Sequence, residues 1–331
     1  MLHTGEVEPK LVGNTRAFRS LIWSTLFLTF IDTIFMGFFA YAINFLLGNA
    51  KIEDISIFLI VPPATCLLAM ILTLPVVSLV GIVSFNKGLD PDIILYPAMS
   101  TIDDIIVTLS YVLVVSLTFI SGSILILSII LILVGVFFFS TIIAKNRREE
   151  VFKRTVIEGG PMVLFSSILG TFGGVGLASL RGEIESRPSV LIIYPALIDT
   201  LGDIGSILGS LQTTKLKLGY VAGYWSSLKS MLLDLVSVEI AAGFMHVLFG
   251  VVAFLFGITM GLSVDMIVLI RIALISNLVS FFFISIISHL VAIQTFRYGL
   301  DPDNFVIPFV TSVSDIGATL SLIATITIIG A

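Results

Sequence analysis

The sequence predicts an all-α polytopic membrane protein of about nine transmembrane helices, with an incomplete parallel internal repeat. Three observations predict it. Hydrophobic residues make up 57% of the 331 residues and charged residues only 12%, whereas roughly 25% of the residues of a soluble protein are charged. Long apolar runs recur along the chain. In addition, a stretch that begins at residue 85 recurs at residue 296.

Nine apolar runs are long enough to form transmembrane helices, since about 20 apolar residues cross a bilayer. They are residues 21–48, 55–85, 92–118, 122–144, 156–180, 190–211, 233–260, 266–296 and 304–330. No small-residue cleavage site follows the first run, so a removable signal peptide is not expected. The single cysteine, Cys66, lies within an apolar run, which excludes a disulfide framework and a cysteine metal site.

Lysine and arginine in the loops indicate the orientation, because they concentrate on the cytoplasmic side. With the N-terminus inside, 13 of them fall on the cytoplasmic side and three on the outer side, and only Arg271 lies in a span. This imbalance predicts a multi-pass protein of the plasma membrane with a cytoplasmic N-terminus and an external C-terminus.

Residues 85–110 align without a gap with residues 296–321, at an offset of 211 residues. Both copies contain Gly-Leu-Asp-Pro-Asp, a later proline and a later aspartate. The offset extends outward, so that the first three spans pair with the last three. Six spans separate each helix from its copy, and the two copies are therefore parallel and related by a pseudo-twofold axis along the membrane normal.

In each copy the Gly-Leu-Asp-Pro-Asp segment lies at the cytoplasmic end of a span. Asp90 and Asp301 are predicted to cap these helices, each with a proline at the first helical position, where its missing N–H costs nothing. Asp92 and Asp303 follow one residue later. A second role, the attraction of cations to the mouth of a pathway, is open for them.

Deeper in each copy, an aspartate has a hydroxyl residue four positions before it and four after it. The residues are Ser100, Asp104 and Thr108 in one copy and Thr311, Asp315 and Thr319 in the other. The spacing places the three on one helical face. Asp104 and Asp315 lie roughly 18 Å along their helices and thus near the middle of the membrane. Burying an acid there costs about 2.5–3.5 kcal/mol, which favours function over a structural hydrogen bond.

Carboxylates, hydroxyls and the carbonyls freed by a proline suit a hard divalent cation. Asp103, which is Ser314 in the other copy, is a further candidate ligand.

The sixth span carries two more acids, Asp199 and Asp203, one helical turn apart. Like charges so placed repel each other unless a cation or a proton lies between them, so both are candidates to line an ion pathway. The alternative is a protonated or hydrogen-bonded packing role. The glycines at 202 and 205 are predicted to permit close helix approach.

Four other ionisable residues of the spans have no counterpart in the other repeat: Asp32, Glu239, His246 and His289. Hydrogen bonding to a neighbouring helix is the simpler interpretation of each, and a path for a proton or a second ion is the alternative. The chain has no Walker lysine motif, zinc-ligand spacing, catalytic triad pattern or basic-aromatic patch. Neither an enzyme nor a nucleic-acid partner is therefore expected.

Two sets of residues follow the same order: a glycine, an Asp-Pro pair, a proline, two hydroxyl residues and an aspartate. They are Gly88, Asp90, Pro91, Pro97, Ser100, Thr101 and Asp104, and Gly299, Asp301, Pro302, Pro308, Thr311, Ser312 and Asp315. This pattern resembles the last transmembrane helix of MgtE-type magnesium transporters and their solute-carrier relatives. The run Pro195-Ala196-Leu197 with Gly202-Asp203-x-Gly205 resembles the second helix of that family, which usually has Asn in place of Asp203.

The resemblance covers spans five to nine as one complete five-helix unit and spans one to three as the last three helices of another. It implies a cytoplasmic segment (1–20), a truncated first repeat (21–118), a linker helix with a basic loop (119–155) and a complete second repeat (156–331). The fourth span is then a linker that crosses the membrane once, because two units with odd numbers of helices stay parallel only if one crossing separates them. In contrast to the bacterial members, large cytoplasmic regulatory domains are not present in the sequence.

By this resemblance, Asp104 and Asp315 are the expected ion ligands, with backbone carbonyls near Ser100 and Thr311. The expected function is transport of a divalent cation, Mg²⁺ before Mn²⁺ and other divalent ions, along a pathway between the two halves. One alternative is a proton- or sodium-coupled carrier of a small organic solute. Another is a membrane scaffold in which the acids bond helices together. Both a monomer that acts as an internal pseudo-dimer and a homodimer in the lipid bilayer are compatible with the sequence.

Overall fold

The computed structural model describes residues 2, 3, 5–120, 124–179, 188–220 and 224–329, and all that follows concerns these residues. The chain divides into two compact units, Met1–Thr171 and Phe172–Ala331. Helix α6 (Gly160–Ser179) contains the division. Each unit is described by itself below.

The first unit contains α1 (Arg16–Leu46), α2 (Ile55–Asn86) and α3 (Pro91–Ile120), which occupy the residues expected for the first repeat. It also contains α4 (Ile124–Asn146) and α5 (Glu150–Arg154), in the stretch expected to be a linker. Helix α2 packs against both α1 and α3. Between α5 and α6 the helix continues through one π-helical turn, Thr155–Gly159.

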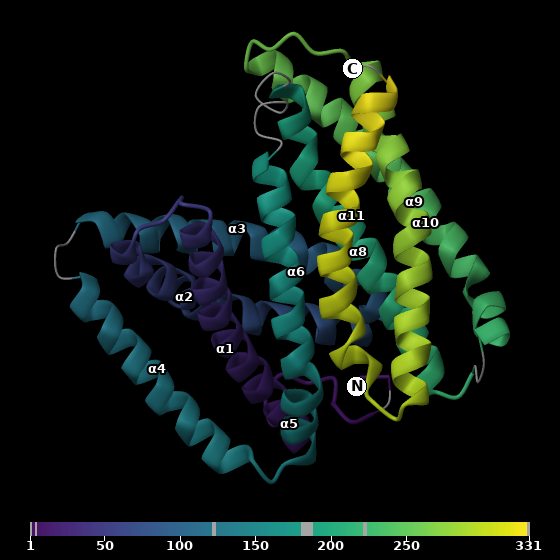
Figure 1. Cartoon of the computed structure of the whole chain (residues 1–331). Helices are drawn as coiled ribbons and strands as arrows, with labels where there is room; N and C mark the ends of the chain where they lie inside the picture. Colours follow the sequence, from purple (N-terminus) through teal and green to yellow (C-terminus); the bar gives the residue numbers. More distant parts are fainter. Residues whose placement is uncertain (1, 4, 121–123, 180–187, 221–223, 330–331) are drawn as a thin grey trace. The chain divides into compact units, whose positions relative to one another are not determined.

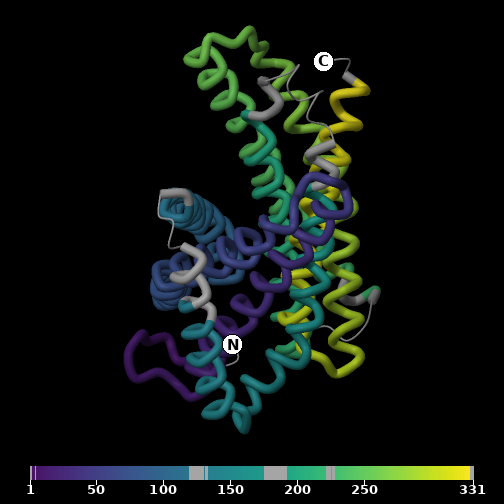
Figure 2. The backbone as a smooth tube through the Cα atoms, turned by 60° about the vertical axis from the view of Figure 1, so that its left-hand side comes forward, coloured from purple at the N-terminus to yellow at the C-terminus, as the bar shows by residue number. Residues whose placement is uncertain are grey.

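The second unit is a bundle of four long helices together with the end of α6. They are α8 (Pro188–Lys217), α9 (Tyr224–Thr259), α10 (Met266–Arg297) and α11 (Val306–Ile329). Helix α10 packs against the other three, and α8 also packs against α9 and α11. Figures 1 and 2 show these helices lying alongside one another. A helix occupies each predicted span. The largest differences are in α9, which begins at Tyr224 and not at residue 233, and in α8, which ends at Lys217 and not at residue 211.

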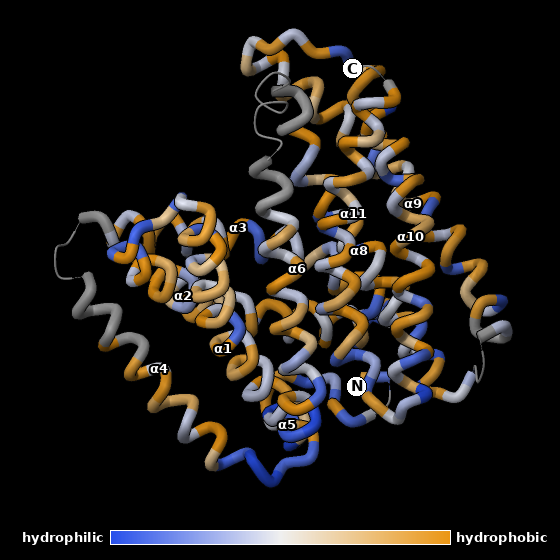
Figure 3. The backbone as a smooth tube through the Cα atoms, in the orientation of Figure 1, coloured by the Kyte–Doolittle hydropathy of each residue, from blue (hydrophilic) through white to orange (hydrophobic). Residues whose placement is uncertain are grey.

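The helices have the length and apolarity of membrane spans. In the described part of the chain, eight helices can cross a membrane by length and composition, and α4 adds a shorter apolar stretch, Leu133–Asn146. Hydrophilic residues gather at the connections, as Figure 3 shows for the segment between α4 and α5. The protein is therefore a multi-pass, all-α membrane protein.

A proline of α2 creates a close contact between two helices of the first unit. Pro62 has no N–H, so the carbonyl of Phe58, four residues earlier, has no helical donor. Gly37 of α1 lies directly against this carbonyl, because a Cβ at Gly37 would be 2.1 Å from the Phe58 oxygen. Only glycine allows α1 to approach α2 this closely.

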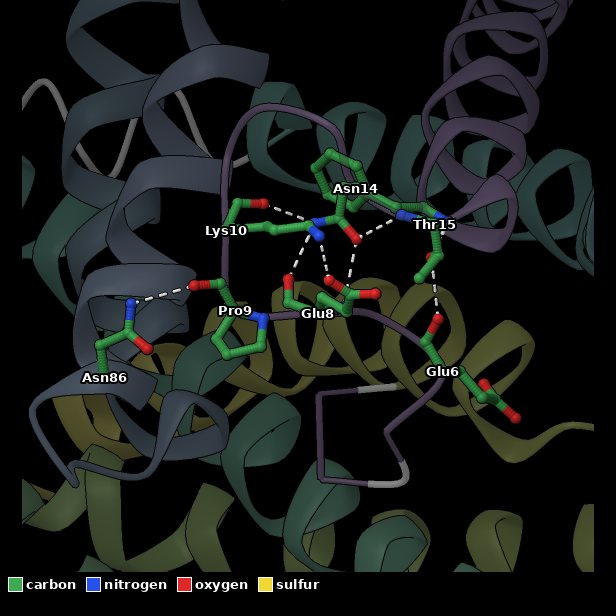
Figure 4. Close-up of polar contacts among 8 residues, drawn as sticks. Glu6, Glu8, Pro9, Lys10, Asn14, Thr15 and Asn86 are labelled. Atoms are coloured by element: carbon green, nitrogen blue, oxygen red, sulfur yellow. Dashed lines mark hydrogen bonds and ion pairs between the residues drawn. The ribbon is translucent and has the colours of Figure 1, made fainter.

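Polar contacts fold the N-terminal segment against the end of α2 (Figure 4). The Asn14 side chain donates to the carbonyls of Glu8 and Lys10, at 2.8 and 2.6 Å. The Asn86 side chain donates to the Pro9 carbonyl at 3.1 Å. Thr15 then caps α1, since its side chain accepts a hydrogen bond from the Phe18 N–H.

Candidate functional site

The repeated Gly-Leu-Asp-Pro-Asp segments cap helices, as the sequence predicts. Asp90 accepts a hydrogen bond from the Asp92 N–H at 3.0 Å, and Asp301 accepts one from the Asp303 N–H at 3.2 Å. The two copies then differ. Helix α3 begins directly at Pro91, whereas a 3₁₀ turn, Pro302–Asn304, precedes α11.

Each of the two segments also meets a nitrogen-bearing side chain that the sequence pattern does not reveal. In the second unit, Lys217 at the end of α8 lies 2.8 Å from Asp301 and 2.6 Å from Asp303. In the first unit, His3 lies 3.1 Å from Asp90 and 3.9 Å from Asp92. Both copies of the repeat therefore have the pair of carboxylates, whereas the side chain that contacts the pair is a lysine in one copy and a histidine in the other.

Replacement of Lys217 by methionine should destabilise the second unit, because Asp301 and Asp303 would lose the ammonium group between them. We expect a loss of about 1–2 kcal/mol, since the three side chains are partly exposed to solvent and charged hydrogen bonds contribute about 1.5–3 kcal/mol. Thermal unfolding of the detergent-solubilised protein measures this loss. Lys229→Met, at an exposed lysine of α9, is the matched control, and equal effects of the two changes would contradict the prediction.

Both deep aspartates lie within regular α-helix, so residues four positions apart lie on one face of the helix in each copy. Asp104 is exposed on α3 and Asp315 is half-buried on α11. In the part of the chain that the structure describes, neither carboxylate forms a hydrogen bond or an ion pair. By contrast, Asp32 accepts a hydrogen bond from Ser167 at 2.5 Å. The duplicated acids thus differ from Asp32, another acid within a span, whose carboxylate has a hydrogen-bond partner.

The hydroxyl residues around the deep acids bond to their own helices. Thr311 donates to the Pro308 carbonyl at 3.2 Å and to that of Ile307 at 3.0 Å. Thr319 donates to the Asp315 carbonyl at 2.9 Å, and Ser100 donates to the Pro97 carbonyl at 3.4 Å. Thr108 is exposed on α3. Since a hydroxyl oxygen has two lone pairs, each of these oxygens can still accept a hydrogen bond or contact a cation.

Position 103 and its repeat equivalent share a property that the sequence does not reveal. One carboxylate oxygen of Asp103 and the hydroxyl of Ser314 are both buried without a hydrogen-bond partner among the described residues. A buried polar atom without a partner is costly. Both copies therefore carry a polar atom with unused bonding capacity next to the deep aspartate.

Contacts between α8 and α11 establish their register. The Tyr194 hydroxyl lies 2.8 Å from that of Thr319, and a Cβ at Gly209 would meet Val306 at 2.1 Å. The two helices are antiparallel, so Asp199 lies at the level of Asp315, and Asp203 lies one turn nearer the N-terminal end of α11. Tyr194 is a neighbour of this region that the sequence analysis did not single out.

The glycines of α8 have different roles. A Cβ at Gly205 would approach Val310 to 2.3 Å and Ile284 to 2.8 Å, whereas a Cβ at Gly202 would meet nothing within 4 Å. Close helix approach is therefore confirmed for Gly205, and the same prediction is wrong for Gly202 among the described residues. The candidate acids are divided between the two units. Asp103 and Asp104 lie in the first unit, and Asp199, Asp203 and Asp315 lie in the second.

Comparison with known protein families finds a match over most of the chain. The sequence model of the family described as "MgtE: Divalent cation transporter" matches residues 1–114 and 194–325. The matched segments contain both copies of the Gly-Leu-Asp-Pro-Asp segment and both deep aspartates. No curated protein and no solved structure matches the chain.

Proposed function

The chain belongs to the MgtE family of divalent cation transporters, and from this premise we propose that it carries Mg²⁺ across the plasma membrane along a pathway lined by Asp104 and Asp315. Transport of divalent cations is the function of the family. The choice of Mg²⁺, the pathway, and the orientation with a cytoplasmic N-terminus and an external C-terminus are our proposals.

The proposal rests on one observation: the two deep carboxylates have no bonding partner among the described residues. Asp104 and Asp315 occupy equivalent positions of the repeat, lie near the middle of membrane-spanning helices, and have no hydrogen bond or ion pair among the described residues. An acid at this depth faces a protein interior or a watery path and needs a partner. A divalent cation passing along the pathway supplies that partner for both.

The neighbouring oxygens favour a hard ion. Thr311 and Thr319 flank Asp315, and Ser100 and Thr108 flank Asp104, so each face offers a carboxylate and hydroxyl oxygens. Mg²⁺ binds such oxygen ligands while it keeps several of its waters. Soft ions prefer thiolate ligands, and the single cysteine of the chain, Cys66, lies in α2 and on neither of these faces.

We propose secondary roles for the other acids of the two units. Asp103 lies beside Asp104 with an unused oxygen, and Asp199 lies at the level of Asp315. Asp203 lies one turn further toward the cytoplasm on α8. These carboxylates increase the negative charge along the pathway and raise the local concentration of cations.

Flux measurements on the purified full chain in proteoliposomes test the proposed function. We expect saturable Mg²⁺ uptake, competition by Mn²⁺ and Co²⁺, and little effect of small organic solutes. The same vesicles with and without a sodium or proton gradient distinguish coupled from uncoupled transport. Uptake of an organic solute without any divalent flux would favour the alternative, a carrier in which the acids bind only a coupling ion.

A further inference from the structure

A carboxyl group and an amide lie side by side within the second unit, away from the deep aspartates of the repeat. Glu239 is on α9 and Asn277 is on α10, and the Asn277 side-chain N–H donates to one oxygen of Glu239, Oε1, at 2.9 Å. Asn277 is fully buried and Glu239 is half-buried. Both residues lie about 17 Å along their spans, Leu228–Thr259 and Met266–Arg297, near the middle of the membrane.

The remaining oxygens of this pair have no donor. Glu239 Oε2 and Asn277 Oδ1 are both buried without a hydrogen-bond partner among the described residues. An ionised carboxylate and an amide carbonyl are acceptors only, so they cannot bond to each other. A carboxylic acid can, because its O–H is a donor. One proton on Oε2 would therefore give a donor to Asn277 Oδ1 and remove both unsatisfied acceptors.

We propose that Glu239 and Asn277 form an intramembrane proton-binding site, whose proton is exchanged with the aqueous phase during metal transport. The coupling to metal transport rests on the proposed function, whereas the binding of the proton does not. In the exchange, Glu239 Oε2–H gives its proton to water and becomes a carboxylate. It regains a proton from water on the return, while the bond from Asn277 to Oε1 persists.

A proton fits this pair better than a metal ion does. Mg²⁺ completes an octahedron of six ligands, usually with several of its own waters, and Ca²⁺ takes six to eight oxygens, whereas the two free oxygens of the pair are buried from solvent. A proton needs just one oxygen to hold it and a second to accept the hydrogen bond.

The charged groups nearby do not balance an ionised Glu239. On α9, Asp234 forms an ion pair with Lys215 of α8. His246 Nδ1 donates to the Ala242 carbonyl at 2.7 Å, and its Nε2 is buried without a hydrogen-bond partner among the described residues, so this imidazole does not contact Glu239. The other titratable groups of the helices packed around Glu239 are Tyr194, Asp199, Asp203 and Lys217 on α8, Tyr224 and Lys229 on α9, and Arg271, His289 and Arg297 on α10. Within the described residues, no cation pairs with Glu239.

Glu239→Gln tests the site without removing its hydrogen bonds. The glutamine amide donates to Asn277 Oδ1 as the carboxylic acid does, so the variant should fold and should mimic a permanently protonated site. Glu53→Gln, at an exposed glutamate between α1 and α2, makes the same chemical change outside the site. Asn277→Leu removes the acceptor and leaves the acid in place.

Infrared spectroscopy of the purified full-length protein reads the proton directly. We expect a carbonyl-stretch band of a protonated carboxylic acid in the wild type and in Glu53→Gln, a shift of this band to higher frequency in Asn277→Leu, and its absence in Glu239→Gln. A band of equal intensity in Glu239→Gln would overturn the proposal. So would a wild-type protein without the band, as expected if a metal ion were bound to an ionised Glu239.

A pH-sensitive dye inside proteoliposomes measures whether protons cross the membrane when the metal is transported. Metal uptake by the wild type and by Glu53→Gln should move protons, and in Glu239→Gln this proton movement should fall to the level of protein-free vesicles. Undiminished proton movement in Glu239→Gln would overturn the coupling. Absence of metal uptake by the wild type would instead refute the proposed function, while the infrared band would still decide whether Glu239 holds a proton.

Discussion

Simultaneous replacement of Asp104 and Asp315 by asparagine should reduce Mg²⁺ flux in proteoliposomes to background. Asparagine keeps the size of the side chain but removes the charge that attracts the cation and one of the two carboxylate oxygens that can bind it. Loss of a group that merely supports a metal ligand costs 10–100-fold in affinity or activity, so we expect a loss of at least ~100-fold when two direct ligands are changed. Each single variant should show a smaller, measurable loss.

The chain offers a matched control for this double variant. Asp54 and Asp265 are also equivalent in the repeat, and they lie at the starts of α2 and α10. The Asp265 side chain accepts hydrogen bonds from the N–H groups of Ile267 and Val268, and asparagine caps helices as well as aspartate does. Asp54→Asn with Asp265→Asn should therefore retain flux. Full flux in the Asp104 and Asp315 double variant, with protein correctly inserted, would show that the pathway lies elsewhere.

Gly37→Ala should strongly destabilise the first unit. The added methyl group would lie 2.1 Å from the backbone oxygen of Phe58, and a backbone atom within a helix cannot move aside as a flexible side chain can. Overpacking commonly costs 1–3 kcal/mol and occasionally more, so we expect a loss of about 3 kcal/mol, despite the better helix propensity of alanine. Unfolding of the solubilised protein with heat or a denaturing detergent measures this effect.

Gly170→Ala is the control for the steric argument. Gly170 lies in α6, where an added Cβ would meet no atom within 4 Å, so the change should be neutral or slightly stabilising. Similar losses at both positions would indicate that helical glycine itself, and not the contact with Phe58, determines stability. Transport by any Gly37→Ala protein that remains folded should be close to normal.

The sequence was sufficient to predict the elements that depend on local patterns. Apolar runs predicted the helices, and the Asp-Pro pairs predicted the caps at Asp90 and Asp301, because capping involves only neighbouring residues. The repeat predicted which acids are equivalent. Family membership could also be anticipated, since the glycine, prolines and aspartate of the last helix form a contiguous pattern.

Contacts between distant residues could not be predicted in the same way. Lys217 and Asp303 are far apart in sequence, as are Glu239 and Asn277, and no periodicity relates them. Pro62 leaves the Phe58 carbonyl without a helical donor, but the position of a proline in the sequence does not specify which helix packs against that carbonyl. The contact with Gly37 therefore could not be predicted. Likewise, Asp103 and Ser314 look like a difference between the copies, yet both have a buried oxygen without a partner.

The π-helical turn at Thr155–Gly159 bears on how relatives of this chain should be compared. A π turn accommodates one more residue than an α turn while the helix continues on both sides. Deletion of one residue there would restore a regular α turn and leave Lys153 and Arg154 on nearly the same side of the helix relative to α6, because the extra residue of the π turn is absorbed within that one turn. In an alignment, relatives with a regular helix would therefore show a one-residue gap within the helix, where a gap is usually taken as an error. Such a gap would record an evolutionary insertion that the helix absorbed without a loop.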